Sequence, residues 1–181
     1  MNLTETGTLV EPAGVRFERQ LPGPIERVWA YLTEADKRRR WLADGAVEER
    51  VGGRIELEFR HAELSPHADD GKAEAGVDMP DCVTLSARVT ACEPPRLLEH
   101  TWPETDGESL VRFELSEHGD GVKLVVVHTK LVTRGLRVDV AAGWHTHLDL
   151  LRDQLEGGSP GPFWPRFAEL KRGYDERVPG A

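Results

Sequence analysis

Histidine is the residue type in this 181-residue sequence whose charge can change near neutral pH, so its positions are the first candidates for chemistry. His128 shares strand parity with Leu124 and Val126, which predicts an imidazole facing the interior. His100 shares parity with Trp102 in the same way. A buried imidazole needs hydrogen-bond partners, either protein groups or a ligand oxygen. The pattern favours core histidines with protein partners and leaves ligand binding and general acid–base catalysis open.

A second pair, His145 and His147, lies in a segment with helical periodicity. Residues two apart on an α-helix point about 160° away from each other. One metal ion cannot take both imidazoles, because a metal-binding pair on a helix needs a common face, as at a spacing of four. We therefore expect two rim residues flanking the apolar stripe of the helix, one of them within reach of a cavity mouth.

The segment 61–81 holds ligand-type side chains without strand or helix periodicity. Two histidines and three carboxylates, types that bind zinc and other divalent ions, fall within its first ten positions. They are His61, Glu63, His67, Asp69 and Asp70. Their spacing matches no defined metal site, so an acidic, hydrated loop is the favoured interpretation and no metal is predicted. A loop of this length is often a lid or a binding loop.

The commonest signatures of nucleophilic, redox and nucleotide chemistry are missing from the sequence, which has no GxSxG, CxxC, GxGxxG or Walker motif. Cys82 and Cys92 lie ten residues apart, about 33 Å along an extended strand, so they cannot bridge each other. No catalytic residue and no cofactor are predicted.

One long helix dominates the elements that must position these side chains. Between residues 141 and 155, apolar side chains recur at spacings of three and four, and Gly157-Gly158 supplies the stop. The stripe consists of Ala141, Trp144, Leu148, Leu151 and Leu155. A single long helix that follows many short strands must pack against the face of a curved antiparallel sheet. That arrangement tends to leave a cavity.

The remaining pattern gives the order of the elements. Val15–Leu21 alternates between apolar and polar residues, which predicts a strand. Pro24 suits the first turn of a helix. A second short helix follows this one and ends near Trp41. Gly52-Gly53 predicts a hairpin turn. Further strands are expected at 54–60, 83–92, 97–102, 111–115 and 122–128. The fold class is therefore α+β, with a curved antiparallel sheet of about seven strands, two short helices after the first strand, and the long helix near the C-terminus.

One domain, residues 15–158, is expected to carry this fold. Residues 1–14 are polar and contain Gly and Pro, which predicts a loose tail. Residues 159–181 form an extension with a helix over Phe163–Tyr174, whose apolar stripe must be covered. Folding back on the domain is favoured, and homodimerisation is the alternative.

The charge balance bounds the partners. With 23 Lys and Arg against 32 Asp and Glu, the net charge is -9, which repels phosphate backbones and anionic lipid headgroups, so nucleic acid is not expected. The basic run Lys37–Arg40 is interpreted as a solvated helix face. No segment approaches the roughly 20 apolar residues that a membrane span needs, and the N-terminus lacks a leader pattern. A cytoplasmic protein without membrane insertion is expected.

Dispersed motifs in a common order carry a resemblance to a known family. They are Pro24-Ile25-Glu26-Arg27-Val28-Trp29, Leu32-Thr33, Trp41-Leu42, Gly52-Gly53, Glu93-Pro94-Pro95-Arg96-Leu97-Leu98, Thr101-Trp102, Val126-Val127-His128-Thr129, and Ala142-Gly143-Trp144 with Leu148-Asp149 and Leu151. Over roughly 15–158 the sequence resembles the activator of heat-shock-protein-90 ATPase homologue group of the START-like (SRPBCC) superfamily. The resemblance implies a helix-grip fold, in which the long helix lies across a seven-stranded sheet.

The resemblance also implies a cavity between sheet and helix that takes lipids, sterols, polyketides or aromatic metabolites. Its expected lining is Phe59, Leu85, His100, Trp102, Phe113, His128, Trp144 and Leu148. The expected function is binding of a small hydrophobic or aromatic molecule, in stress response or secondary metabolism. Two alternatives stay open: a cyclase-, dehydratase- or hydrolase-like enzyme that uses His128 or His100 as acid or base, and a chaperone-associated interaction protein.

Overall fold

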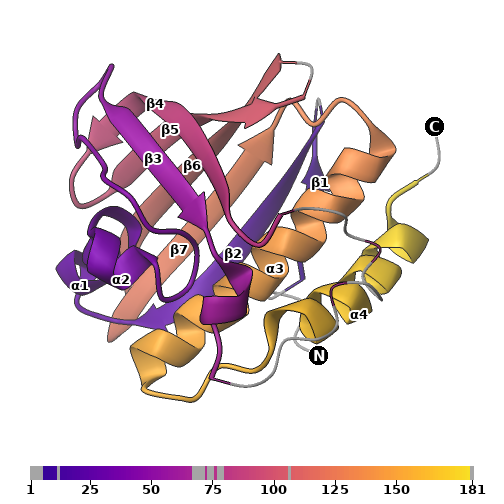
Figure 1. Cartoon of the computed structure of the whole chain (residues 1–181). Coiled ribbons are helices and arrows are strands. Elements are labelled where there is room, and N and C mark those ends of the chain that lie inside the picture. Colours follow the sequence, from indigo (N-terminus) through magenta and orange to yellow (C-terminus); the bar gives the residue numbers. More distant parts are fainter. Residues whose placement is uncertain are drawn as a thin grey trace.

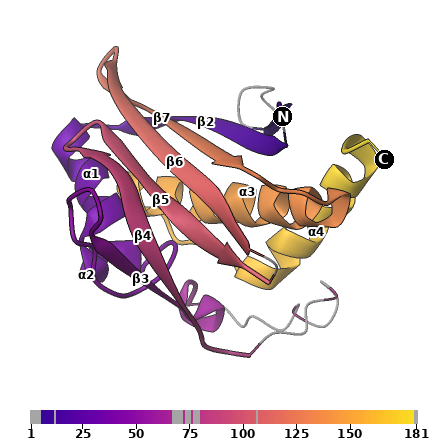
Figure 2. The same ribbon diagram turned by 90° about the horizontal axis from the view of Figure 1, so that it is seen from above.

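A seven-stranded antiparallel sheet curves around one long helix, α3 (Arg134–Glu156), in the computed structural model of this protein (Figures 1 and 2). The structure describes residues 6–11, 13–66, 72, 76, 80–105 and 107–179. The strands are β1 (Thr8–Val10), β2 (Gly14–Pro22), β3 (Arg54–Phe59), β4 (Val83–Glu93), β5 (Leu97–Glu104), β6 (Gly107–His118) and β7 (Gly121–Thr129). They lie in the order β1-β2-β7-β6-β5-β4-β3. The predicted α+β helix-grip fold class is confirmed.

The helices lie on one side of this sheet. Helices α1 (Ile25–Thr33) and α2 (Ala35–Arg38) follow β2, and the short 3-10 helix η1 (His61–Glu63) follows β3. Helix α3 crosses the concave face, and α4 (Phe163–Arg177) packs beside it at the end of the chain (Figures 1 and 2). The predicted helix at 163–174 is confirmed, and its apolar side chains are buried by folding back on the domain.

Strand register decides which side chains face α3. Val15 pairs with His128 and Phe17 pairs with Val126 across β2 and β7, and all four side chains are buried. On the other side of β7, Phe113 pairs with Val126. Because successive side chains on a strand alternate between the two faces, His128 joins this apolar layer rather than the solvent face, as its parity predicts.

Helix α3 begins earlier than the apolar stripe indicates. It starts at Arg134 instead of Ala141, with Thr133 as its N-cap: the Thr133 hydroxyl oxygen accepts a hydrogen bond from the Leu136 N–H at 3.1 Å. Its first turn is only partly buried and contains two arginines and a glycine, so it carries no periodic apolar signal. The helix ends at Gly157, whose φ of 75° is left-handed, as the sequence predicts.

The N-terminal segment is more ordered than predicted. Thr8–Val10, in the expected loose tail, pairs with Gly14–Arg16 of β2 and forms the edge strand β1. The backbone N–H of Gly7 also donates to the Tyr174 hydroxyl at 2.8 Å. The tail prediction is therefore wrong for this stretch, because long-range backbone and side-chain contacts fix residues whose local sequence carries no pattern.

Arg38 corrects the interpretation of the basic run. Its side chain is buried and donates hydrogen bonds to the carbonyl oxygens of Ala43, Asp44, Gly45 and Glu56 at 2.6 to 3.2 Å. Burial lowers the pKa of Arg38 to about 10. This residue holds the segment after α2 against β3, so it is not part of a solvated face.

The predicted hairpin before β3 reduces to the isolated bridges Asp44–Glu58 and Val47–Ile55.

Across the part of the chain that the structure describes, no helix combines the length and the hydropathy that a membrane crossing requires.

Candidate functional site: a cavity between the sheet and two helices

A cavity of about 320 Å³ lies between the sheet, α3 and α4. Its described lining comes from the loop after α2, from η1, from strands β3, β4, β5 and β7, and from both long helices. The lining residues are Leu42, Phe59, His61, Val83, Leu85, Trp102, His128, Asp139, Val140, Gly143, Trp144, His147, Phe163, Trp164 and Phe167. Aromatic rings and imidazoles dominate this set. Such a lining suits a flat or apolar molecule held by few polar contacts.

The structure brings together five of the eight side chains predicted to line the cavity. Phe59, Leu85, Trp102, His128 and Trp144 all contribute to its wall.

The other three are buried without contributing to the described lining. His100 stacks on Trp102 and Phe113, with ring centroids 6.2 and 6.0 Å apart. Phe113 meets Trp144 edge to face at 5.5 Å, and Leu148 is fully buried on α3. His100 and Phe113 thus pack against the lining rings of Trp102 and Trp144 on the side away from the cavity.

Sequence reasoning missed much of the remaining wall. His61 and His147 lie next to each other in this wall, with ring centroids 5.5 Å apart. Phe163 and Trp164 of α4 lie 4.4 and 4.9 Å from the ring of His61. The apolar stripe at 163–174 predicted that this helix packs against another surface. It did not predict that the helix would form part of a cavity wall.

The prediction that His145 and His147 are rim residues is wrong, because both are buried. It is right that they point to opposite sides of the helix. His147 lines the cavity, whereas His145 faces away towards β2 and α4, where it contacts Phe17 and Tyr174. Packing of α4 against α3 covers the side that the sequence pattern leaves open.

Predictions on the 61–81 loop fall partly outside the described residues. His61 and Leu64 are buried at its start, so this end is packed rather than hydrated. His67, Asp69 and Asp70 lie outside the described residues. Among the described residues, no group of three or more His, Cys, Asp or Glu is arranged to hold a metal ion.

His128 sits in a chain of directed hydrogen bonds behind the cavity wall. The indole N–H of Trp144 donates to its Nδ1 at 2.9 Å, so Nδ1 carries no proton. The proton of the neutral ring is then on Nε2, which donates to the Ser109 hydroxyl oxygen at 2.7 Å. The Ser109 hydroxyl in turn donates to the Glu104 carboxylate at 2.7 Å. Both ring nitrogens are therefore used within the protein, which favours a core histidine over an acid–base catalyst.

His147 is held from one side only. Its Nδ1 lies 2.6 Å from the backbone carbonyl oxygen of Trp41, and since a carbonyl only accepts, Nδ1 carries the proton and donates. The described residues offer the other nitrogen, Nε2, no hydrogen-bond partner, and the ring lines the cavity. The neutral ring thus presents an acceptor to whatever occupies the cavity.

Among the described residues, the three histidines that line the cavity and His100 behind its wall are neutral at ordinary pH. Burial lowers the pKa of His128 and of His147 to about 3, and that of His61 and of His100 to about 4. The mutual proximity of His61 and His147 also lowers the pKa of His147. Among the described lining residues, Asp139 is the one with a charged side chain, and it forms an ion pair with Lys171 at 2.9 Å. Apart from this ion pair, the described wall of the cavity is uncharged at neutral pH.

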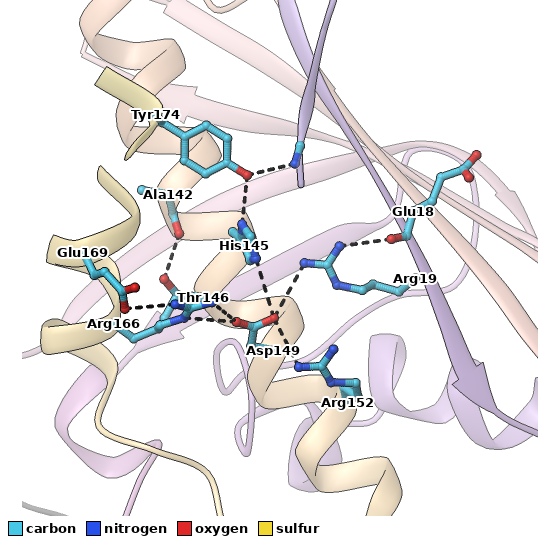
Figure 3. A network of polar contacts seen from close by, with 11 residues as sticks. Glu18, Arg19, Ala142, His145, Thr146, Asp149, Arg152, Arg166, Glu169 and Tyr174 are labelled. Carbon is cyan, nitrogen blue, oxygen red and sulfur yellow. Dashed lines mark hydrogen bonds and ion pairs between the residues drawn. The ribbon is translucent and has the colours of Figure 1, made fainter. Parts of the chain in front are cut away.

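The opposite side of α3 carries a charged network centred on Asp149 (Figure 3). Its carboxylate accepts hydrogen bonds from Arg166 of α4 at 3.1 and 3.2 Å, and it lies 3.7 Å from both Arg19 of β2 and Arg152. His145 approaches it at 3.8 Å. The network joins β2, α3 and α4, and thereby fixes the position of the helix that closes the cavity.

Comparisons with known proteins identify the relatives of this chain. A family model described as activator of Hsp90 ATPase homolog 1-like protein matches residues 22–156. The comparison with curated proteins gives no match. Among solved structures, the protein encoded by gene BPP1335 of Bordetella parapertussis is 42% identical, with a TM-score of 0.78, over 96% of this chain and 91% of that chain.

More distant structures share the fold. CalU16 from Micromonospora echinospora is 22% identical, with a TM-score of 0.67, over 97% of this chain and 96% of that chain. DynU16 is 19% identical, with a TM-score of 0.64, over 83% of this chain and 50% of that chain. These structural neighbours have helix-grip-like folds, and the family match covers most of the sheet and all of α3. The chain belongs to the activator of Hsp90 ATPase homolog 1-like protein family.

Proposed function

We propose that this protein binds a small hydrophobic or aromatic molecule in the cavity between the sheet, α3 and α4. The observation that carries the proposal is a cavity of about 320 Å³, open to the surface and walled by aromatic rings. Aromatic side chains that line a concave space rather than filling it are typical of sites for small apolar molecules. A volume of this order falls within the range of small-molecule sites.

The comparisons support this proposal at the level of the fold. DynU16 is named for the dynemicin biosynthetic locus, and its likeness supports a setting in secondary metabolism as part of the proposal. Stress response, the other setting suggested by the sequence, follows from the family name alone.

Binding is favoured over acid–base catalysis by the state of the histidines. Both nitrogens of His128 are engaged with Trp144 and Ser109, and the one described hydrogen bond of His100 joins its Nδ1 to the Thr101 carbonyl. The Nε2 of His147 does face the cavity, but a pKa of about 3 makes it a weak base. The cavity therefore holds groups suited to orienting a ligand rather than to moving its protons.

Gly143 offers a direct test, because it lines the cavity from α3. A Cβ built there has Phe167 as its nearest neighbour, 4.0 Å away, so a Leu side chain at this position would extend into the cavity without displacing backbone. Gly173 of α4 is the matched control, since a Cβ there meets nothing within 4 Å and the residue does not line the cavity.

The measurement is native against denaturing mass spectrometry of the protein purified from its own cells, for the wild type, Gly143→Leu and Gly173→Leu. The expected result is an organic mass released from the wild type and from Gly173→Leu, and none from Gly143→Leu. A wild type that carries no organic molecule and does not bind added 2-naphthol would contradict the proposal.

A further inference from the structure

Few polar groups of the described residues reach the cavity. Two of them are the imidazoles of His61 and His147, which lie next to each other in its wall with ring centroids 5.5 Å apart. Two other polar side chains of the wall are already engaged, the Trp144 N–H with His128 and His128 with Ser109, and the Trp102 indole N–H is a donor only. Among the described residues, a ligand hydroxyl group in this space therefore finds its side-chain acceptors chiefly at these two rings.

His147 is the ring with a fixed orientation. Its Nδ1–H is committed to the Trp41 carbonyl oxygen at 2.6 Å, so the tautomer is set and Nε2 presents a lone pair. Trp41 is itself fully buried, and its indole N–H donates to the Tyr31 carbonyl oxygen at 2.8 Å. This contact anchors Trp41, whose carbonyl oxygen is the partner of His147. The acceptor is thus preorganised by contacts that do not depend on a ligand.

His61 complements this acceptor with an adaptable ring. It packs nearly parallel to Phe59, with an interplanar angle of 15° and centroids 5.7 Å apart, and against Phe163 and Trp164. These contacts fix the plane of the ring but leave its tautomer free. His61 can therefore meet either a donor or an acceptor on a ligand.

The same surroundings disfavour anions. No described lining residue carries a positive charge, and the charged lining residue, Asp139, is negative. A carboxylate or phosphate entering the cavity would lose its hydration without gaining a cation, which costs several kcal/mol for an unpaired charge. An uncharged hydroxyl group, in contrast, loses little if it finds a hydrogen-bond acceptor.

Building on the proposed function, we propose that His147 is the specificity-determining residue of the cavity: its Nε2 accepts a hydrogen bond from the hydroxyl group of an uncharged, hydroxylated aromatic ligand, and the cavity rejects carboxylated analogues. The aromatic walls supply binding energy to any flat apolar molecule. The imidazole distinguishes the hydroxylated molecule from its unsubstituted or anionic counterparts.

The test uses three probes of the same ring system: 2-naphthol, 2-methylnaphthalene and 2-naphthoate. Binding to the whole chain is followed by tryptophan fluorescence and by calorimetry at neutral pH. The key variant is His147→Asn, because the Asn side-chain amide can keep the donor to Trp41 O while removing the acceptor that points into the cavity. His118→Asn, at an exposed position beside the β6–β7 turn, is the control.

The expected result is selective. His147→Asn weakens 2-naphthol binding about tenfold and changes 2-methylnaphthalene binding by less than about twofold, in line with the loss of one buried hydrogen bond. 2-Naphthoate binds the wild type at least about tenfold more weakly than 2-naphthol. His118→Asn leaves all three affinities unchanged.

A second readout needs no variant. In ¹⁵N spectra of the wild type, the His147 Nε2 resonance has the position of an unprotonated nitrogen and shifts on addition of 2-naphthol but not of 2-methylnaphthalene. Equal losses of both probes in His147→Asn, or a protonated Nε2 in the free protein, would overturn the assignment of His147. Failure of every probe to bind would instead overturn the proposed function.

Discussion

His145 and His147 lie two residues apart on α3, yet their surroundings are opposite in kind. His147 faces a cavity walled by aromatic rings, and one of its nitrogens has no hydrogen-bond partner among the described residues. His145 faces the charged network of Asp149, where its Nδ1 lies 2.9 Å from the Tyr174 hydroxyl and its Nε2 faces the carboxylate (Figure 3). One residue type therefore serves a cavity on one side of the helix and a structural joint on the other.

The two sides of α3 differ in how they contact the rest of the fold. The side with Asp149 contains charges on three elements, which hold α3, α4 and β2 together. On the side with His147, the described residues of the cavity wall make one such cross-link, between Asp139 of α3 and Lys171 of α4, and the rest of the wall borders an open volume. A helix held firmly on one side can leave the other side underpacked without collapsing, and this arrangement sustains the cavity.

Acidification should give the largest effect, and it should act on the cavity side. His61, His100, His128 and His147 have pKa values of about 3 to 4 in the folded protein and about 6.5 when unfolded, so the unfolded state binds more protons between these limits. Stability is therefore complete above the unfolded pKa and falls as the pH drops towards 4. At pH 5 each histidine costs about 2 kcal/mol, together about 8 kcal/mol.

Urea unfolding between pH 7.5 and 5 measures this loss. His147→Asn removes one of the four histidines that bind a proton on unfolding, so the loss of stability at pH 5 should shrink by about 2 kcal/mol. His118→Asn should retain the full loss. A stability that is flat over this pH range would show that the cavity histidines are not desolvated.

Asp149→Asn should give the next largest effect, on the opposite side of α3. The substitution removes the negative charge that faces the Arg19 side chain, which is 1% exposed, and weakens the contact with Arg166. Breaking one partner of a buried ion pair costs about 3 kcal/mol. The free energy of unfolding from urea titration is the measurement.

Glu169→Gln is the matched control, because Glu169 also pairs with Arg166, at 2.9 Å, but its side chain is 61% exposed. A surface pair of this kind contributes less than about 1 kcal/mol. Similar losses in the two variants would mean that the Asp149 network is no more than a surface feature.

Ser109→Ala tests the chain of hydrogen bonds behind the cavity wall. It removes the acceptor of the His128 Nε2–H, and since Ser109 is fully buried, the orphaned donor costs about 2 kcal/mol. Ser116→Ala, at an exposed position on the same strand, should be neutral. The thermal unfolding midpoints of both variants are the measurement. An unchanged midpoint for Ser109→Ala would show that this chain of hydrogen bonds does not stabilise the fold.

Gly143→Ala should give the smallest effect, and one of opposite sign. Alanine stabilises a helix interior by about 1 kcal/mol relative to glycine, and its Cβ fits in front of Phe167. Gly173→Ala should give a similar gain without touching the cavity. We expect weaker binding of 2-naphthol in Gly143→Ala alone; equal binding in both variants would place the ligand elsewhere.

The fold could be predicted from the sequence because its signals are local. Alternation in β2, β6 and β7 and the spacing of three and four in α3 each reflect which side chains face one shared core. All eight predicted lining residues lie on elements whose parity is readable in this way, and five of them line the cavity. His61 could not be placed, because it lies in a loop whose position depends on contacts with Phe163 and Trp164, about a hundred residues away.

The same reasoning explains the errors. Arg38 belongs to a run of four basic residues, and its burial is visible only when the carbonyl oxygens of Ala43, Gly45 and Glu56 are placed around it. Thr8–Val10 has no distinctive pattern and becomes a strand because β2 offers it a free edge. Side chains and backbone that gain their partners at long range leave little trace in local periodicity.

The sequence by itself determined the α+β architecture, the inward face of each strand, and the divergence of His145 from His147, since these depend on the geometry of single helices and strands. Only the tertiary structure decided that α4 covers α3, that Asp149 gathers charges from β2 and α4, and that His147 keeps a free nitrogen facing an open cavity. The physical reason is that volume, desolvation and hydrogen-bond partners are properties of packed surfaces, and no local pattern specifies which surfaces meet.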